Sequence, residues 1–305
     1  MTIREQMTQR FPVRRTPEQK EAFRRWIQDE AGKMGYSAQV EEAGKHQNVV
    51  IGAPETAQAI FTAHYDTPVG FFLPNFMTPR NRVFKWVKQV GMILLFALLG
   101  TIVGVPVWLL TDNGRVGFLA GYAVYMFLAV GMLIGPANKN NVNDNTSGVA
   151  AVLELMARIP EEKRATAAFI LFDNEEKGLL GSKAYAKAHP AVKESGFVVN
   201  LDCVGDGGHI LLISSEKARE AAPYTAMTEG MKAAIGRELH IFPMETSAGS
   251  SDHKSFETSS VIYACNVKKG IGFYCDKIHT SKDIVCDQGN LDFIADGLSS
   301  FVSKL

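Results

Sequence analysis

The sequence predicts an α/β fold with a mixed central sheet and helices on both faces, interrupted by an inserted hairpin of two apolar helices. Three observations predict it. Segments with strand and helix patterns alternate along the chain, and 46% hydrophobic residues among 305 provide a large core. Uncharged residues are concentrated in 90–110 and 116–135. Alternating strands and helices are typical of a sheet that helices cover on both faces.

The first predicted elements precede the apolar segment. The Thr16 hydroxyl, followed three residues later by Gln19, has the spacing of a helix capping box, and Gly35 is placed to end that helix. Short runs rich in β-branched and aromatic residues then predict two strands. These strands are expected at 48–51 and 59–63.

The alternation resumes after the apolar segment. Continuous apolar runs such as 169–172 are typical of strands that are buried on both faces. The expected strands are 167–172, 197–201 and 261–265, and the expected helices are 147–158, 179–188 and 216–235.

Charge and cysteine content exclude several classes of protein. The chain has 32 basic and 32 acidic side chains, so no net positive field attracts nucleic acid. Its four cysteines form no C-x-x-C pair and fit free thiols in a reducing compartment. The basic residues before Thr16 have no apolar run behind them, unlike a secretory signal, so we expect a cytoplasmic start.

The apolar segment predicts an integral membrane protein. Residues 90–110 would form about 31 Å of helix, and 116–135 nearly as much, each close to the thickness of a bilayer's hydrocarbon core. A polar turn at 111–115 separates the two spans. We therefore expect one discontinuous domain, 1–79 and 137–305, with a transmembrane hairpin inserted at 80–136.

Basic residues predict the orientation of this hairpin. Only Arg115 lies in the turn, whereas most flanking cations lie outside the spans: Arg80, Arg82, Lys85, Lys88 and Lys139. The positive-inside rule then leaves the domain of 1–79 and 137–305 in the cytoplasm. Two G-x-x-x-G motifs, at 100–104 and 117–121, allow close helix approach and favour a homo-oligomer without setting its stoichiometry. The alternatives are a hairpin packed inside a soluble oligomer and a lid over a substrate.

Metal-binding side chains gather where the predicted strands end. Loops at the carboxyl ends of strands converge in open α/β sheets, and carboxylates with imidazoles suit Zn²⁺ or a similar divalent ion. The candidates follow strands or lie in polar loops: His64, Asp144, Glu175, Glu176, Asp202 and His279.

These residues stand in runs that occur in a fixed order. The runs are Ala63-His64-Tyr65-Asp66, Asp144-Asn145-Thr146-Ser147-Gly148, Glu175-Glu176-Lys177-Gly178-Leu179-Leu180-Gly181-Ser182, Asn200-Leu201-Asp202 and Ile278-His279-Thr280. The chain closely resembles the M28 family of dinuclear zinc aminopeptidases over roughly 16–72 and 137–300. The resemblance implies a zinc-exopeptidase-like fold, a peptide substrate and two zinc ions per chain.

The resemblance also implies a role for each candidate. Glu175 would take no metal and act as the general base toward a water activated by the two zinc ions. The ligand roles are His64 and Asp202 on one ion, Glu176 and His279 on the other, and Asp144 bridging both. Asp66, two residues after His64, suits a carboxylate that orients the ligand imidazole and supports catalysis indirectly.

Ser251, Asp252 and His253 are consecutive, so they cannot easily form the relay of a catalytic triad. M28-like sequences often carry a similar run beside the active site. Two interpretations stay open for Asp252 and His253: contact with the substrate or the metal shell, or a purely structural turn. Asp173 is expected at the surface or behind the ligands.

The predicted function is a membrane-anchored zinc aminopeptidase that hydrolyses N-terminal peptide bonds. One alternative is a single-zinc acyltransferase that resembles glutaminyl cyclase, which shares this scaffold. Another is a membrane scaffold that keeps the peptidase fold without catalysis. The presence of all five proposed ligands and of Glu175 argues against the scaffold.

Overall fold

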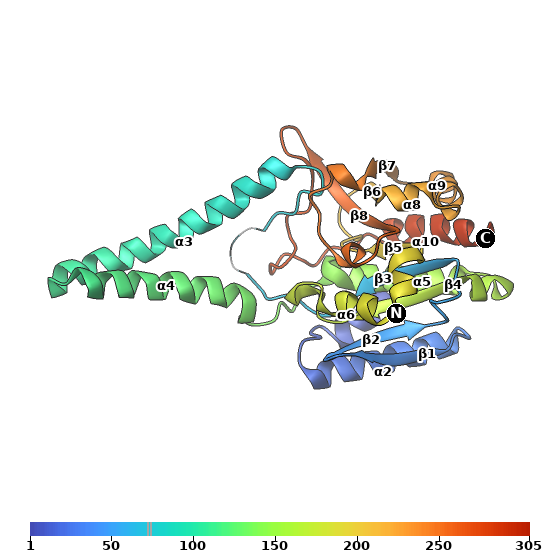
Figure 1. Ribbon diagram of the computed structural model, residues 1–305, viewed down its shortest axis with the longest axis horizontal. Helices are drawn as coiled ribbons and strands as arrows, with labels where there is room; N and C mark the ends of the chain where they lie inside the picture. The colour runs from blue at the N-terminus through green and yellow to red at the C-terminus, as the bar shows by residue number, and fades with distance from the viewer. Residues whose placement is uncertain (72, 74) are drawn as a thin grey trace.

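The computed structural model describes residues 1–71, 73 and 75–305 (Figure 1). In this part of the chain, nine strands form one mixed sheet. From one edge to the other the strands are β1 (Ala38–Ala43), β2 (His46–Ile51), β4 (Ala167–Phe172), β3 (Ala59–His64), β5 (Val198–Leu201), β8 (Ser259–Lys268), β6 (His209–Ser214) and β7 (Glu238–Pro243), with β9 (Gly272–Tyr274) paired to β8.

Four parallel strands, β4, β3, β5 and β8, form the centre of the sheet. The connection from β3 to β4 leads to one side of β3, and β5 then lies on its other side. This reversal opens a crevice at the carboxyl end of β3, which is where α/β sheets bind their ligands.

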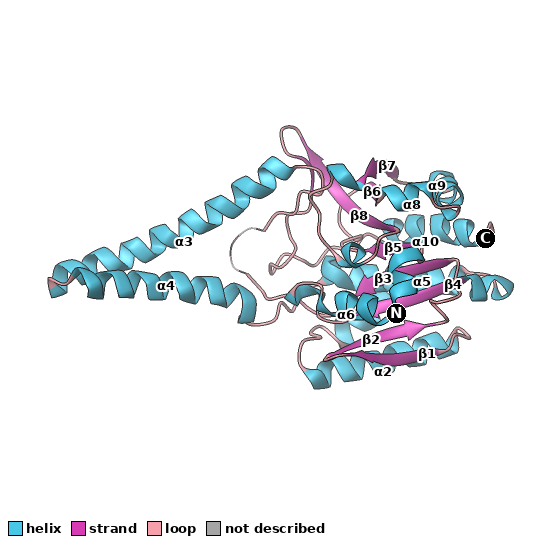
Figure 2. Cartoon of the chain, viewed as in Figure 1, coloured by secondary structure: helices cyan, strands magenta, loops and turns pink. Residues whose placement is uncertain are grey.

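Helices cover both faces of the sheet (Figure 2), as the sequence predicts. Alternate strand residues point to opposite faces, so Phe61 packs in the larger core and its neighbour Ile60 in the smaller one. Helices α1 (Ile3–Arg10), α2 (Pro17–Lys33), α5 (Gly148–Arg158), α8 (Glu216–Glu220), α9 (Pro223–Ala233) and α10 (Gln288–Ser303) contribute to the larger core, and α6 (Leu180–Ala188) and α7 (Pro190–Ser195) to the smaller.

Local signals in the sequence give mixed results. The Thr16 hydroxyl accepts a hydrogen bond from the Gln19 backbone N–H, and Oε1 of Gln19 accepts one from the Thr16 backbone N–H, so the capping box is confirmed. The single helix expected at 216–235 is wrong. It is divided into α8 and α9, because Ala221 is extended and Pro223 begins a new helix.

The inserted segment forms two long helices, α3 (Arg82–Thr111) and α4 (Gly114–Ile134), that project from the rest of the chain (Figure 1). The turn between them uses Asp112 in the left-handed conformation and Asn113 as the cap of α4. Both helices are long and apolar enough to cross a membrane. Most of their large side chains are exposed, including Leu110 (86%) and Phe127 (77%), whereas Phe96 is buried.

Glycines hold α3 and α4 together at the end far from the sheet. A Cβ on Gly100 would lie 2.6 Å from the Gly121 carbonyl oxygen, and one on Gly104 would lie 2.7 Å from that of Gly117. The two G-x-x-x-G motifs therefore pack against each other within one hairpin. Toward the sheet the helices diverge, so the hairpin has the shape of a wedge (Figure 1).

Candidate metal centre

Three neighbouring strands deliver the first candidate side chains to one place. His64 is the last residue of β3, and Asp202 directly follows β5. Glu175 and Glu176 form a short 3-10 turn after β4. Because β4, β3 and β5 are parallel neighbours, these side chains meet in the crevice at the carboxyl end of β3.

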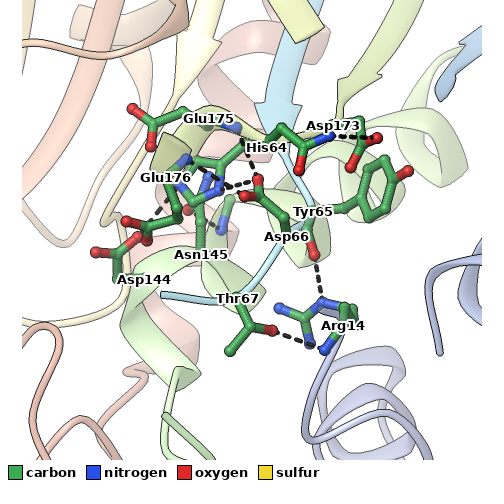
Figure 3. Close-up of polar contacts among 12 residues, drawn as sticks. Arg14, His64, Tyr65, Asp66, Thr67, Asp144, Asn145, Asp173, Glu175 and Glu176 are labelled. Atoms are coloured by element: carbon green, nitrogen blue, oxygen red, sulfur yellow. Dashed lines mark hydrogen bonds and ion pairs between the residues drawn. The ribbon is translucent and has the colours of Figure 1, made fainter. Parts of the chain in front are cut away.

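Asp144 lies beside Glu176 and near His64 (Figure 3). Its Oδ1 is 3.2 Å from Nε2 of His64, and its Oδ2 is 2.9 Å from Nε2 of His279. The same His279 nitrogen lies 3.4 Å from Oε2 of Glu176. One carboxylate thus has a separate imidazole beside each of its two oxygens.

The donor atoms form three groups that could each hold a metal ion, and Asp144 belongs to two of them. These two are His64, Asp144 and Asp202, and Asp144, Glu176 and His279; the third is His64, Glu175 and Glu176. Nε2 of His64 and Oε1 of Glu176 are buried and form no hydrogen bond of acceptable geometry with the described residues, although Oδ1 of Asp144 lies 3.2 Å from that nitrogen. Buried ligand atoms without a hydrogen bond, in a set of imidazoles and carboxylates, fit Zn²⁺.

Electrostatics also favours a cation here. Burial is the main cause that raises the pKa of the carboxyl groups of Glu176 and Asp202, and the nearby Asp144 charge adds to it. Burial likewise raises the pKa of Glu175, as do the neighbouring charges of Asp252 and Asp202. Like charges collected in a buried site repel, and a bound divalent cation would offset that repulsion.

Asp66 positions the turn that carries the two glutamates (Figure 3). Its Oδ1 accepts a hydrogen bond of 2.9 Å from the Glu175 backbone N–H, and its Oδ2 one of 3.3 Å from that of Glu176. Oδ1 also lies 3.4 Å from Nδ1 of His64. The structure therefore places Asp66 behind His64, and adds contacts with the glutamate turn that the sequence did not suggest.

Two positioning residues were missed by sequence reasoning. Both oxygens of the Asp283 carboxylate accept backbone hydrogen bonds, 2.7 Å from Asn143 and 3.1 Å from Asp144. The fully buried Arg14 donates to Oδ1 of Asn141 and to Oγ1 of Thr146, in the loop that carries Asp144. Asp283 lies only four residues after His279, and this closeness to a candidate ligand is the one feature of the sequence that could have indicated it.

Asp173 lies in the interior, so of its two expected places the surface is wrong and a place behind the ligands agrees with the structure. Its carboxylate is buried and forms an ion pair of 2.5 Å with the buried Lys20. Lys20 also donates to Oδ1 of Asn174, the residue before Glu175. This pair joins helix α2 to the loop that ends in the glutamate turn.

Asp252 and His253 are both fully buried, but they have different surroundings. The charge of Asp252 raises the pKa of Glu175, which places Asp252 beside the cluster, and burial raises the pKa of Asp252 itself to about 7. Burial lowers the pKa of His253 to about 3, which favours a neutral imidazole. His253 is in neither of the two donor groups that contain Asp144.

Comparison with known sequences identifies the family. The sequence model of Peptidase family M28 matches residues 129–302, more than half of the chain. The chain belongs to peptidase family M28. The predicted enzyme class, a zinc metallopeptidase, is confirmed with it. The family match begins after His64 and Asp66, so these two residues lie outside it.

Curated relatives of this M28 peptidase include vacuolar membrane proteases. One from Eremothecium gossypii is 27% identical over 147 residues, which are 47% of this chain and 14% of the relative. One from Candida albicans is 38% identical over 72 residues, which are 23% of this chain and 8% of the relative. The chain thus matches a small part of these much longer proteins.

Solved structures with the same fold come from several bacteria. A glutaminyl cyclase of Porphyromonas gingivalis has a TM-score of 0.60 at 16% identity, covering 99% of this chain and 96% of that one. A Zn-dependent exopeptidase of Parabacteroides distasonis has a TM-score of 0.58 at 14% identity, covering 97% and 94%. These likenesses confirm the predicted zinc-exopeptidase fold around the M28 site.

Proposed function

We propose that this M28 peptidase is an aminopeptidase that hydrolyses N-terminal peptide bonds with two zinc ions. The observation that carries the proposal is the pair of donor groups that share Asp144. His64 and Asp202 would hold one ion, Glu176 and His279 the other, and Asp144 both. Two ions held in this way would polarise the scissile carbonyl and make water a stronger nucleophile.

Glu175 is the proposed general base. It lines the same cavity as the two donor groups that share Asp144 and belongs to neither of these, although it forms a third group with His64 and Glu176. With the ions in the two groups that share Asp144, its carboxylate would stay available for proton transfer. Its raised pKa favours accepting a proton from the attacking water and returning it to the leaving amine. Asp66 accepts a hydrogen bond from the Glu175 backbone N–H and so fixes the backbone position from which the Glu175 side chain extends.

The test is the variant Glu175→Gln, which keeps the size of the side chain and removes the base. We expect it to retain the metal content of the wild type and to lose about 10²- to 10⁴-fold in kcat toward leucine amide. Metal content is measured by elemental analysis of the purified protein. Full activity of Glu175→Gln would overturn the role of Glu175 as the base.

Cyclisation of N-terminal glutamine is the second candidate, because the fold also matches a glutaminyl cyclase over nearly the whole of both chains. The two donor groups favour hydrolysis, since the rival mechanism uses a single zinc ion. One tightly bound ion per chain, together with release of pyroglutamyl peptides from glutaminyl peptides, would favour the cyclase.

We also propose that α3 and α4 cross a membrane, with the peptidase domain of 1–79 and 137–305 on the cytoplasmic side. The exposed apolar side chains of both helices and the basic residues at the start of α3 support this orientation. A cysteine introduced at Asn113, in the turn, should react with a membrane-impermeant thiol reagent only from the side opposite to the cytoplasm. Labelling from the cytoplasmic side would contradict the proposal.

A further inference from the structure

The metal centre and the base of the hairpin line one continuous cavity of about 790 Å³. Glu175, Glu176 and His279 lie in one part of its wall. Another part is formed by α3 and α4, where they diverge toward the sheet (Figure 1). The side chains that these helices contribute are mostly apolar and include Ile93, Phe96, Tyr125, Ala129, Met132 and Leu133.

The glycine contacts explain why this wedge is open. Gly100 and Gly104 of α3 touch Gly121 and Gly117 of α4 at the far end, where the backbones meet. Nearer the sheet the bulkier Phe96 and Tyr125 stand between the helices, with their ring centroids 6.3 Å apart. The wedge is thus closed at its far end and opens toward the metal centre.

The apolar wall reaches the depth of the hydrocarbon core. Phe96 lies six residues beyond Val90, the first residue of the uncharged segment, or about 9 Å along the helix. Lys88 marks the boundary on the catalytic side, where its Nζ donates to Oδ1 of Asn75 and to the Phe76 carbonyl oxygen. A substrate in this cavity would therefore have its scissile bond at the metal centre and its remaining chain between apolar helices.

We propose that this peptidase acts on apolar peptides that partition into the membrane, with the chain after the scissile bond lying between α3 and α4. The proposal rests on the proposed function and names the substrate class of the same site. Burial of apolar side chains against Ile93, Phe96 and Met132 would favour such peptides over polar ones. A polar chain would leave its hydrogen-bonding groups unpaired in the wedge.

The experiment uses the full chain in lipid nanodiscs and three substrates. Leucine amide is too short to enter the wedge. Two peptide amides share an N-terminal leucine and alanine and differ in their last four residues, which are phenylalanine and leucine in one and serine and glutamine in the other. We expect kcat/KM for the apolar peptide to be higher by about tenfold or more.

A matched pair of variants separates the wedge from simple concentration of the apolar peptide in lipid. Ala129→Trp fills the wedge, and Ala123→Trp adds the same ring to an exposed position on the same helix. We expect the preference to fall below about threefold in Ala129→Trp and to persist in Ala123→Trp. Two results would overturn the substrate class but not the proposed function. One is hydrolysis of leucine amide together with equal rates for the two peptides, and the other is a preference for the apolar peptide that survives Ala129→Trp. Hydrolysis of none of the three would overturn the proposed function.

A separate cluster, on the edge of the sheet, carries a second proposal. His209 on β6 is paired with Glu238 on the edge strand β7, and His240 follows two residues later on the same face. Nδ1 of His209 lies 3.1 Å from both Nε2 of His240 and Oε2 of Glu238. Oε1 of Glu238 lies 3.3 Å from Nε2 of His240.

The distance of 3.1 Å between the two histidine nitrogens matches the spacing of two ligands on a tetrahedral metal, and one ligand atom from each of the three residues lies within 4.8 Å of the others. Two ligands at about 2.0–2.1 Å from a tetrahedral ion lie about 3.3 Å apart, and two imidazoles with one carboxylate suit Zn²⁺. The Phe273 ring packs against both histidines, with its centroid 4.8 Å from that of His240, and so restricts their movement. The geometry points to a further zinc site, independent of the metal centre, that ties strand β7 to β6.

The test is metal stoichiometry in three variants. Zinc binding is measured by equilibrium dialysis of His64→Ala/His279→Ala, in which the first centre is disrupted. We expect one remaining ion, lost when His209→Ala/His240→Ala is added. The control is the addition of His189→Ala instead, since His189 contacts two glutamates elsewhere. An unchanged zinc content after removal of His209 and His240, or no remaining ion at the start, would overturn the proposal.

Discussion

The sheet with its covering helices, called the sheet domain below, and the hairpin of α3 and α4 bury different kinds of residue. In the sheet domain the largest apolar side chains, such as Phe61 and Phe169, are fully buried. In the hairpin, Leu110 and Phe127 are exposed, and the contact between the helices is made by Gly100 and its partners. Water drives apolar side chains inward, whereas helices that cross a membrane, as we propose for α3 and α4, would gain most from close backbone packing.

The two regions also treat charge in opposite ways. The sheet domain collects Asp144, Glu175, Glu176 and Asp202 in a buried crevice, but 90–110 and 116–135 carry no charged side chain. Such a concentration of buried carboxylates needs a compensating cation. The comparison teaches that the candidate site lies where the sheet domain buries charged side chains instead of apolar ones. The hairpin extends the wall of this site.

The largest expected effect comes from the carboxylate shared by both donor groups. Asp144→Asn keeps the shape of the side chain but removes the charge that faces His64 and His279. We expect loss of bound zinc and a fall in kcat/KM for leucine amide of about 10³-fold. Asp29→Asn, an exposed acidic residue on α2, is the control and should change neither quantity. Normal zinc content and activity in Asp144→Asn would refute the shared role of Asp144.

The candidate site was predictable in sequence because its residues follow buried strands. His64 and Asp202 each stand at the end of an apolar run, so strand pattern and fold class together place them at one edge. The supporting contacts were not predictable. Arg14 and Asp283 reach the loop of Asp144 from segments distant in sequence, and only the folded chain brings them there.

The fold likewise divides into elements that the local sequence pattern predicts and elements that depend on contacts with distant segments. The paired helices of the hairpin and the strands β3 and β4 have continuous apolar patterns, and the sequence located them within a few residues, apart from a longer start of α3. The edge strand β7 has no such pattern. It contains Glu238 and His240 and is held by its pairing with β6, so only tertiary contacts reveal it.

Gly100→Leu tests the packing rule of the hairpin. A side chain here would clash with the Gly121 carbonyl oxygen, whereas Gly91 on the same helix has open space around its Cα. We expect Gly100→Leu to reduce the free energy of unfolding in detergent micelles by about 1–3 kcal/mol and Gly91→Leu to have little effect. Equal destabilisation by both substitutions would show that the glycine contact does not hold the helices together.

The smallest expected effect concerns the pH dependence of stability. The uncharged spans of the hairpin cannot contribute to it, so it must come from the sheet domain. Burial lowers the pKa of His189, but hydrogen bonds of 2.6 Å to Glu41 and Glu55 outweigh it and leave this pKa raised. A raised pKa stabilises the fold fully below about pH 6.5, and that contribution is lost as the pH rises through the folded-state pKa. Because His189 is half-buried and its partner Glu55 is 49% exposed, water screens the ion pairs, and His189→Gln should lower Tm by only about 1–2 °C at pH 6 and by less at pH 9. A larger effect of His189→Gln at pH 9 than at pH 6, measured by thermal unfolding, would mean that His189 stabilises the domain as a neutral ring stacked on Tyr185 and not as a cation between two carboxylates.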